Sequence, residues 1–329
     1  MRIAVYGAGA IGAFVGSRLA EAGHDVALIA RGAHLHAIRA NGVRVESELF
    51  GASTYRLKAT SEASQIGPVD YLLLGVKAMS LTAIAPLCAP LLGPETAIVS
   101  CQNGLPWWYF HGVEGETDTR VEAVDPGGVI WQNLPPERVI GGIAYISSEI
   151  PEPGYVLHTE GNRFPMGEPS GGRTERAKAF SQALIQGGLK APIRNDIRHE
   201  LWVKLMGNAI YNPLSSLTRA TMREMLDTPE TYEIMRRAMD ECRETAAAVG
   251  VQIAFSSEQR LEGSRVAGEH KTSMLQDLEA GKAPELEPIT GAVLELAHKR
   301  HVPVPTLETI YAAAKLLFET EAKQRKNER

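Results

Sequence analysis

The first thirty residues carry the feature that most constrains this chain, a glycine-rich turn between an apolar run and a helix-forming run. Residues 2–6 (RIAVY) suit a buried parallel strand, and residues 13–22 are rich in helix formers and end before Gly23. Between the two runs lies the sequence Gly7-Ala8-Gly9-Ala10-Ile11-Gly12. Residues 25–30 form a second β-rich run. A strand, a glycine turn, a helix and a strand in this order are typical of a dinucleotide-binding unit.

Each glycine of the turn has a physical reason in such a unit. Gly7 permits the tight turn, Gly9 lets the backbone approach a pyrophosphate, and Gly12 lets the helix pack closely on the strand. The first turn of the helix then presents free N–H groups and the positive end of its dipole to the phosphates. We therefore predict that residues 7–12 bind a dinucleotide cofactor; a glycine turn without a ligand is the alternative.

The end of the second strand bears on which cofactor fits. Enzymes that use NAD place an acidic residue there for the ribose 2′-hydroxyl, whereas enzymes that use NADP place an arginine nearby for the 2′-phosphate. The strand here ends in Ala30-Arg31, and the acidic Asp25 lies at its other end. This pattern predicts NADP(H), bound through Arg31. A solvated Arg31 that only starts the next helix is the alternative.

Further apolar runs of strand length lie at residues 43–46, 55–59, 69–76 and 96–101. A helix broken by Pro86 and Pro90 is expected at 80–92. Short strands at 139–148, 154–158 and 163–166, and a helix at 174–186, follow later in the chain. Because strands alternate with helices, we predict an α/β domain with a doubly wound parallel sheet of the Rossmann type.

The pattern changes at two places along the chain. Residues 105–136 form an irregular stretch with the pair Trp107-Trp108, which we interpret as an insertion. Toward the C-terminus the sequence becomes helical, in segments separated by Gly or Pro, one of which is expected at 285–300. A chain of 329 residues is expected to hold about two domains. We predict an NADP-binding domain at 1–194 and an all-helical substrate and catalytic domain at 195–329.

Composition argues against several classes of function. Lys and Arg total 34 against 39 Asp and Glu, which gives a net charge of −5 and no basic domain for nucleic acid. No apolar run approaches the ~20 residues that span a bilayer. Cys88, Cys101 and Cys242 are too widely spaced for a metal site or a disulfide framework, so buried thiols in a reducing compartment are expected. We expect a cytoplasmic protein that acts on a small molecule, without a metal, nucleic acid or membrane.

Two polar residues follow strands of the predicted sheet. Lys77 comes after the run 69–76, and Asn103 comes after the run 96–101. Open α/β sheets bind their ligands at the carboxyl ends of the strands. We therefore predict that Lys77 and Asn103 line the nicotinamide end of the cofactor site, although such residues are also ordinary in loops.

A polar stripe stands out on the first helix of the C-terminal domain. Lys204, Asn208 and Asn212 are four residues apart and so share one face of a helix whose other sides are apolar. Burying a lysine and two amides costs several kcal/mol unless they find partners. Such groups are candidates for a functional site. A structural polar network at the domain boundary is the alternative.

The chain resembles the ketopantoate reductase (2-dehydropantoate 2-reductase) family over most of its length. The resemblance rests on several short motifs in the same order. They are GAGAIG (7–12) with LIAR (28–31), VKA (76–78), QNG (102–104), KLMGNAIYNPL (204–214), TSMLQD (272–277) and the segment 280–291.

The resemblance implies an NADPH-dependent reduction of 2-dehydropantoate to pantoate, on the path to pantothenate and coenzyme A. It implies that Lys204 is the general acid and that Glu285 positions the substrate hydroxyl or the lysine. It assigns the substrate's hydroxyl and carboxylate to Asn208, Asn212 and Ser273, and places Asn103 and Lys77 beside the nicotinamide and the substrate. It also implies that the protein is a monomer or a homodimer.

Two departures from the family pattern keep other functions open. Thr290 stands where members of the family commonly have asparagine, and residues 105–136 are longer than the usual connection after QNG. A reductase of a different branched or bulky 2-oxo acid is therefore one alternative. A non-catalytic NADP-sensing module is another, but the Lys204 stripe would be useless to a mere sensor.

Overall fold

The computed structural model describes residues 1–116 and 119–327, which form two compact units. The sheet unit comprises Met1–Gln102, Pro106–Arg120 and Asp125–Glu200. The helical unit comprises Asn103–Leu105, Val121–Val124 and Leu201–Arg329. The chain therefore crosses between the units at several points, the last of them inside a helix.

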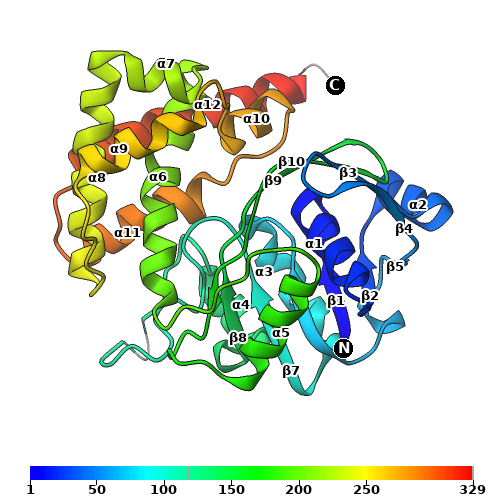
Figure 1. Ribbon diagram of the computed structural model, residues 1–329. Helices are drawn as coiled ribbons and strands as arrows, with labels where there is room; N and C mark the ends of the chain where they lie inside the picture. The colour runs from blue at the N-terminus through cyan, green and yellow to red at the C-terminus, as the bar shows by residue number, and fades with distance from the viewer. Residues whose placement is uncertain (117–118, 328–329) are drawn as a thin grey trace. The chain divides into compact units, whose positions relative to one another are not determined.

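The sheet unit contains a seven-stranded sheet with the order β11-β8-β7-β6-β1-β2-β5 (Figure 1). The strands are β1 (Arg2–Tyr6), β2 (Asp25–Ile29), β5 (Lys58–Thr60), β6 (Val69–Leu74), β7 (Leu92–Ser100), β8 (Val139–Gly142) and β11 (Met166–Gly167). Neighbouring strands are parallel except β11, which is antiparallel to β8. The predicted doubly wound parallel sheet is confirmed. Its strand order reverses between β1 and β6, which is where such sheets bind ligands.

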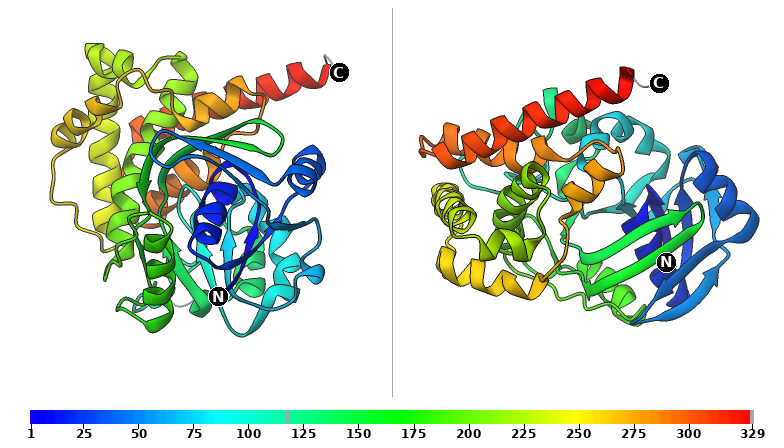
Figure 2. Two further views of the ribbon diagram at one scale, coloured as in Figure 1. Left: turned by 45° about the vertical axis from the view of Figure 1, so that its right-hand side comes forward. Right: turned by 90° about the horizontal axis from the view of Figure 1, so that it is seen from above.

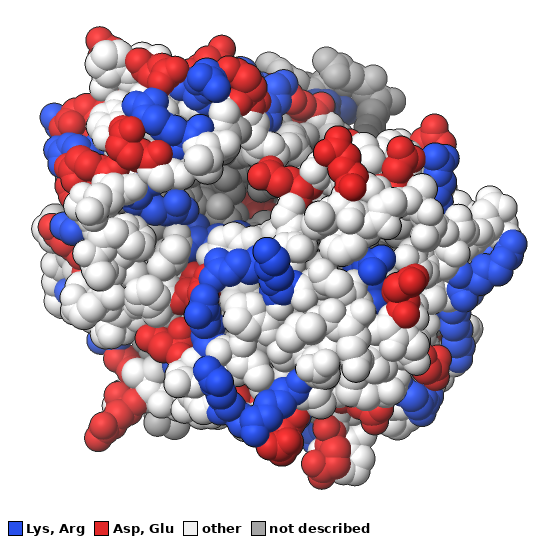
Figure 3. Space-filling view, in the orientation of Figure 1, with Lys and Arg blue, Asp and Glu red and all other residues white. Residues whose placement is uncertain are grey.

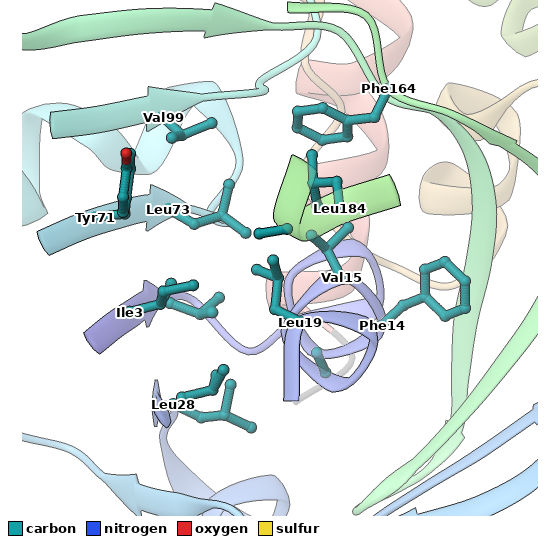
Figure 4. Packing of buried hydrophobic residues seen from close by; sticks show 14 of the residues in the cluster. Ile3, Phe14, Val15, Leu19, Leu28, Tyr71, Leu73, Val99, Phe164 and Leu184 are labelled. Carbon is teal, nitrogen blue, oxygen red and sulfur yellow. The ribbon is translucent and has the colours of Figure 1, made fainter. Parts of the chain in front are cut away.

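Two helices of the sheet unit, α1 (Ala10–Glu21) and α5 (Glu175–Gln186), pack their apolar side chains against strands of the sheet. Figure 4 shows Val15 and Leu19 of α1 pointing toward the strands that carry Ile3 and Leu73, with Leu184 of α5 beside Val15. All five side chains are buried. Burial of an aliphatic side chain of this size stabilises a fold by about 1.5–3 kcal/mol, so this cluster holds the glycine turn before α1 in a fixed place.

The segment that we expected to be a broken helix at 80–92 is divided into short helical pieces of different kinds. A 3₁₀ turn at Ala78–Ser80 leads into α3 (Leu81–Ile84), and a further 3₁₀ stretch covers Ala85–Leu91. Pro86 lies in its first turn and Pro90 inside it. Each proline removes a backbone donor, so a regular α-helix cannot continue through this segment.

A second, four-stranded sheet was not foreseen. Its order is β4-β3-β10-β9, with β3 (Val43–Ser47), β4 (Gly51–Tyr55), β9 (Tyr145–Glu152) and β10 (Tyr155–Arg163) (Figure 2). Residues 55–59, which we expected to form one strand, are therefore divided between the end of β4 in this sheet and the start of β5 in the seven-stranded sheet. Residues 139–148 are divided in the same way between β8 and β9. His158 fixes this sheet from inside, because its Nδ1 lies 2.7 Å from Ser47 Oγ and its ring stacks on Phe14 at 4.2 Å.

The irregular stretch after residue 105 belongs largely to the core of the sheet unit. Trp107 and Trp108 are 5% and 1% exposed. Trp108 Nε1 donates a hydrogen bond of 2.7 Å to Ser100 Oγ at the end of β7, and Trp107 Nε1 donates one of 3.0 Å to Leu134 O. The Trp108 ring lies against Gly141, where a side chain would overlap it. The indoles thus fill the interior of this unit, close to α4 (Val129–Asn133).

The helical unit confirms the predicted all-helical C-terminal domain. Its helices are α6 (Ile197–Thr218), α7 (Met222–Asp227), α8 (Pro229–Ala248), α9 (Ser257–Ser264), α10 (Ser273–Glu279), α11 (Ala292–Lys299) and α12 (Pro305–Asn327). The first turn of α6 belongs to the sheet unit. The helix expected at 285–300 differs, since it opens with a π-helical turn at Glu287–Gly291 before α11 begins.

Charged side chains of both signs are interspersed over the face shown in Figure 3. On α8, for example, Arg236 pairs with Glu233 at 2.8 Å and with Asp240 at 2.9 Å. Within residues 1–116 and 119–327, none of the helices combines the length and the hydropathy needed to cross a bilayer.

Candidate active site

The glycine turn packs against the end of the neighbouring strand. Gly7 has a φ of +97°, which favours glycine, and a Cβ there would come within 2.7 Å of Val76 N. A Cβ on Gly12 would overlap the carbonyl oxygen of Gly7. Gly75, directly after β6, is equally confined, because its Cβ would overlap the same oxygen. Three backbone segments therefore meet here at a distance that only glycines allow.

Gly9 is different, because the protein leaves space beside it. A Cβ at this position would meet nothing closer than Gly75 O, at 3.8 Å. Gly9 is also the N-cap residue of α1, without a side-chain cap, and no acidic residue occupies the first turn of that helix. Helices leave their first N–H groups without intrahelical acceptors, here those around Ala10 and Ile11. This open, donor-rich cradle fits the pyrophosphate of a dinucleotide.

The predicted arginine lies at the carboxyl end of β2. Arg31 is exposed and is the N-cap residue of α2 (Gly32–Asn41), whereas Asp25 is the first residue of β2. The charge of Arg31 also acts on Tyr6, the last residue of β1. Burial raises the pKa of Tyr6 and Cys88 raises it further, whereas the Arg31 guanidinium lowers it. Arg31 thus places a positive charge near the carboxyl ends of β1 and β2, where a bound 2′-phosphate would need one.

Lys77 also lies at a strand end. It is half-buried, follows β6 and Gly75-Val76, and caps the 3₁₀ turn at Ala78–Ser80. The N–H of Gly75 donates to Tyr6 O at 2.8 Å, so this loop is tied to the end of β1.

In the helical unit, α6 carries the predicted polar stripe. Lys204 and Asn208 are half-buried, and Asn212 is 4% exposed. Lys204 Nζ donates a hydrogen bond of 2.8 Å to Asn103 Oδ1. Two site residues predicted from separate motifs, 101 positions apart, are therefore in direct contact.

Asn103 is held by the two residues that follow it. Gly104 has a φ of +90°, and a Cβ there would overlap Pro288 O. The N–H of Leu105 donates to the same oxygen at 2.8 Å. The QNG segment thus needs its glycine for a close approach to the π-helical turn, and this contact places the Asn103 amide.

Asn212 has an amide group that the surrounding protein does not satisfy. Its Nδ2 is buried and has no acceptor among the residues that the structure describes. Leaving a buried donor unpaired costs about 1–3 kcal/mol. Such a group needs an explanation, and a ligand that accepts the hydrogen bond is one.

Ser273 and Glu285 stand at the edges of short elements in the same unit. Ser273 is exposed at the first position of α10, after the N-cap residue Thr272, whose hydroxyl bonds to Ser215 Oγ of α6. Glu285 is 8% exposed and comes just before the π-helical turn. Lys204, Asn103, Asn208, Asn212, Ser273 and Glu285 therefore belong to the helical unit, whereas residues 7–12, Arg31 and Lys77 belong to the sheet unit.

Sequence reasoning missed several residues that support these groups. Gly75 had a readable signal, a glycine directly after the apolar run VDYLLL. Ser215 and Thr272 had none, because their contact joins residues 57 positions apart. Thr290 was noted only as a departure from the family pattern.

Comparison with known proteins supports one family. The model described as "Ketopantoate reductase PanE/ApbA" matches residues 3–171, and its C-terminal counterpart matches residues 196–318. The "2-dehydropantoate 2-reductase" of Mesorhizobium japonicum is 44% identical over 96% of this chain and 98% of its own length.

Solved structures agree with this. A protein of Ralstonia solanacearum MolK2 has a TM-score of 0.92 at 35% identity, covering 97% of this chain and 98% of its own. A 2-dehydropantoate 2-reductase from Methylococcus capsulatus has a TM-score of 0.83 at 30% identity, covering 98% of both chains. The chain belongs to the ketopantoate reductase family.

Proposed function

We propose that this protein catalyses the NADPH-dependent reduction of 2-dehydropantoate to pantoate. The observation that carries the proposal is the 2.8 Å hydrogen bond from Lys204 Nζ to Asn103 Oδ1, on a helix face that also bears Asn208 and Asn212. A lysine held beside amide groups suits the protonation and orientation of a polar ketone. The 44% identical relative named 2-dehydropantoate 2-reductase supports this choice of substrate.

Reduction of a ketone places a hydride on carbon and a proton on oxygen. NADPH supplies the hydride when it is bound. The ammonium of Lys204 stabilises the negative charge that develops on the carbonyl oxygen and then donates a proton to it. Asn103 Oδ1 accepts a hydrogen bond from Nζ and so limits the rotamers of a long, flexible side chain.

The remaining polar groups hold the substrate. Asn208, Asn212 and Ser273 bind its carboxylate and hydroxyl, and the buried Glu285 accepts a hydrogen bond from the hydroxyl or orients Lys204. The unsatisfied Nδ2 of Asn212 supports this assignment, since a substrate oxygen would supply the acceptor that the protein lacks. Fixed orientation of the reactants is the main entropic gain from such groups.

The sheet unit supplies the cofactor-binding residues other than Asn103. The backbone of residues 7–12 receives the pyrophosphate, Arg31 pairs with the 2′-phosphate, and Lys77 and Asn103 serve the nicotinamide end. The open space at Gly9 supports the binding of a dinucleotide, and the position of Arg31 at the end of β2 supports NADPH over NADH.

The test is a panel of substrates. NADPH oxidation is followed with 2-dehydropantoate and with other branched or bulky 2-oxo acids, and NADPH binding is measured by calorimetry. We expect the highest kcat/KM for 2-dehydropantoate. A clear preference for another 2-oxo acid would assign a different substrate to the same chemistry. Tight NADPH binding without turnover of any acid would instead indicate a sensor.

A further inference from the structure

The helix that carries the proposed proton donor contains a proline. Pro213 lies inside the 22-residue α6, directly after Asn212. A proline has no N–H, so the carbonyl four residues earlier, Ala209 O, loses its helical donor. Ala209 is fully buried, and water therefore cannot replace that donor.

A threonine from a distant element supplies the missing hydrogen bond. Thr290 Oγ1 donates to Ala209 O at 3.0 Å across 81 positions of the sequence. Thr290 is fully buried and lies in the π-helical turn Glu287–Gly291. The hydroxyl therefore gives Ala209 O a donor in place of the N–H that Pro213 lacks.

The same turn also holds the partner of Lys204. Pro288, two residues before Thr290, accepts the N–H of Leu105, which fixes the segment that carries Asn103. Ala209 is next to Asn208 in α6. One turn thus contacts both α6, through Thr290, and the segment that carries Asn103, through Pro288. Such π-helical turns are frequent at functional sites.

We propose that Thr290 is a positioning residue, whose hydroxyl replaces the donor that Pro213 lacks and so holds the Lys204, Asn208 and Asn212 stripe in register with Asn103. Thr290 would affect catalysis through α6, because its hydroxyl bonds to a backbone carbonyl of that helix. Its effect on catalysis rests on the proposed function, whereas the exchange of donors between Thr290 and Pro213 does not.

The experiment is a double-mutant cycle of Thr290→Val and Pro213→Ala. Valine keeps the shape of threonine and removes the donor, and alanine at 213 returns a backbone N–H to Ala209 O. We expect Thr290→Val to lower the unfolding temperature and to lower kcat roughly tenfold, with the KM for NADPH unchanged, because a slightly misplaced proton donor slows chemistry and not cofactor binding. In the Pro213→Ala background the same substitution should cost clearly less in both measurements.

Two further variants separate positioning from general stability. Thr290→Ser keeps the hydroxyl and should keep kcat within about twofold of the parent. Thr245→Val removes an equally buried hydroxyl, whose 2.8 Å bond to Glu241 O stays within α8, and should lower stability but not kcat.

If Thr290→Val lowers the unfolding temperature equally in the parent and in the Pro213→Ala background, the claim that Thr290 replaces the donor missing at Pro213 is wrong. Coupling in unfolding temperature without any change in kcat would overturn the positioning role and leave a purely structural bond. If the parent protein turns over no 2-oxo acid, the proposed function fails, and the unfolding cycle still decides whether Thr290 replaces the donor of Pro213.

Discussion

The glycines of the turn at residues 7–12 serve two different purposes. Gly12 is confined by the protein itself, because any side chain would overlap Gly7 O. Gly9 faces open space, because a Cβ at this position would have Gly75 O, 3.8 Å away, as its nearest neighbour. Packing therefore explains the first glycine, and the second leaves the space that the proposed cofactor would need.

Exchanging each of these glycines for alanine separates the two purposes. Gly9→Ala should fold with a loss of at most about 1 kcal/mol, the scale of an N-cap change, but should bind NADPH much more weakly. Gly12→Ala should lose several kcal/mol of stability, because a backbone segment must move. Thermal unfolding without cofactor, followed by NADPH titration, measures both effects. Unchanged NADPH affinity in Gly9→Ala would show that the open space is not the pyrophosphate cradle.

In the proposed function, Arg31 sets the preference between the two nicotinamide cofactors through the 2′-phosphate. Arg31→Ala should weaken NADPH roughly 10- to 100-fold, the range for a lost hydrogen bond to a charged group, and should leave NADH nearly unaffected. Arg39→Ala is the matched control, since this exposed arginine of α2 bonds Ala59 O at 3.0 Å. Calorimetric titration of both cofactors reads the difference. An equal loss for NADPH and NADH would contradict a contact with the 2′-phosphate.

Among the helices, α11 binds the short segment Val121–Val124, which belongs to the helical unit, through the carboxylate of Glu295. Glu295 accepts backbone N–H groups from Glu122 at 2.9 Å and from Ala123 at 2.8 Å, and pairs with Lys299 at 2.8 Å. Burial alone would raise the pKa of Glu295, but Lys299 and the two N–H groups bring it below the ordinary value of 4.5. A lowered carboxyl pKa stabilises the fold above pH 4.5, and this contribution is lost as the pH falls through the lowered pKa.

Glu295→Gln should therefore destabilise the protein at neutral pH but not in acid. We expect a loss of about 1 kcal/mol near neutrality, after allowing for solvent screening of the pair, and a difference that vanishes as the pH falls through the lowered pKa of Glu295. Glu175→Gln is the control, because its pair with Lys178 is exposed. Denaturant unfolding across the pH range measures the difference. A loss that persists in acid would show that the charge of Glu295 does not hold this segment.

Elements with local signals could be predicted from the sequence, and elements that depend on distant partners could not. The strand, glycine turn and helix at residues 2–21 are consecutive, so their pattern identified them. The second sheet pairs β3 with β10 across more than a hundred residues. The sequence of neither strand indicates which other strand it pairs with. The π-helical turn was also missed, because the apolar spacing of residues 285–300 is compatible with a plain α-helix.

The same distinction explains the candidate site. The stripe of Lys204, Asn208 and Asn212 follows from helical spacing alone. Its contact with Asn103 could be expected only from family resemblance, since no periodicity links the two segments. From the sequence, Thr290 was only a departure from the family pattern. The fold explains it, because its hydroxyl donates to Ala209 O, the carbonyl that lacks the N–H of residue 213.

Across the whole molecule, most of the proposed cofactor-binding residues and the proposed proton donor belong to different units. The features that fit NADPH belong to the sheet unit, and the stripe with Asn103 belongs to the helical unit. The chain passes from one to the other at Gln102–Asn103, directly after β7, and again within α6 between Glu200 and Leu201. The proposed reaction requires both sets of residues.

Turnover of 2-dehydropantoate by Lys204→Ala tests this account most directly. NADPH oxidation is measured for the parent and the variant at saturating NADPH and substrate, with NADPH binding measured separately. Loss of the general acid should lower kcat at least 10²-fold while NADPH still binds, because the glycine turn, Arg31 and Lys77 lie in the other unit. Parent-like turnover in Lys204→Ala would contradict the central claim that this lysine donates the proton.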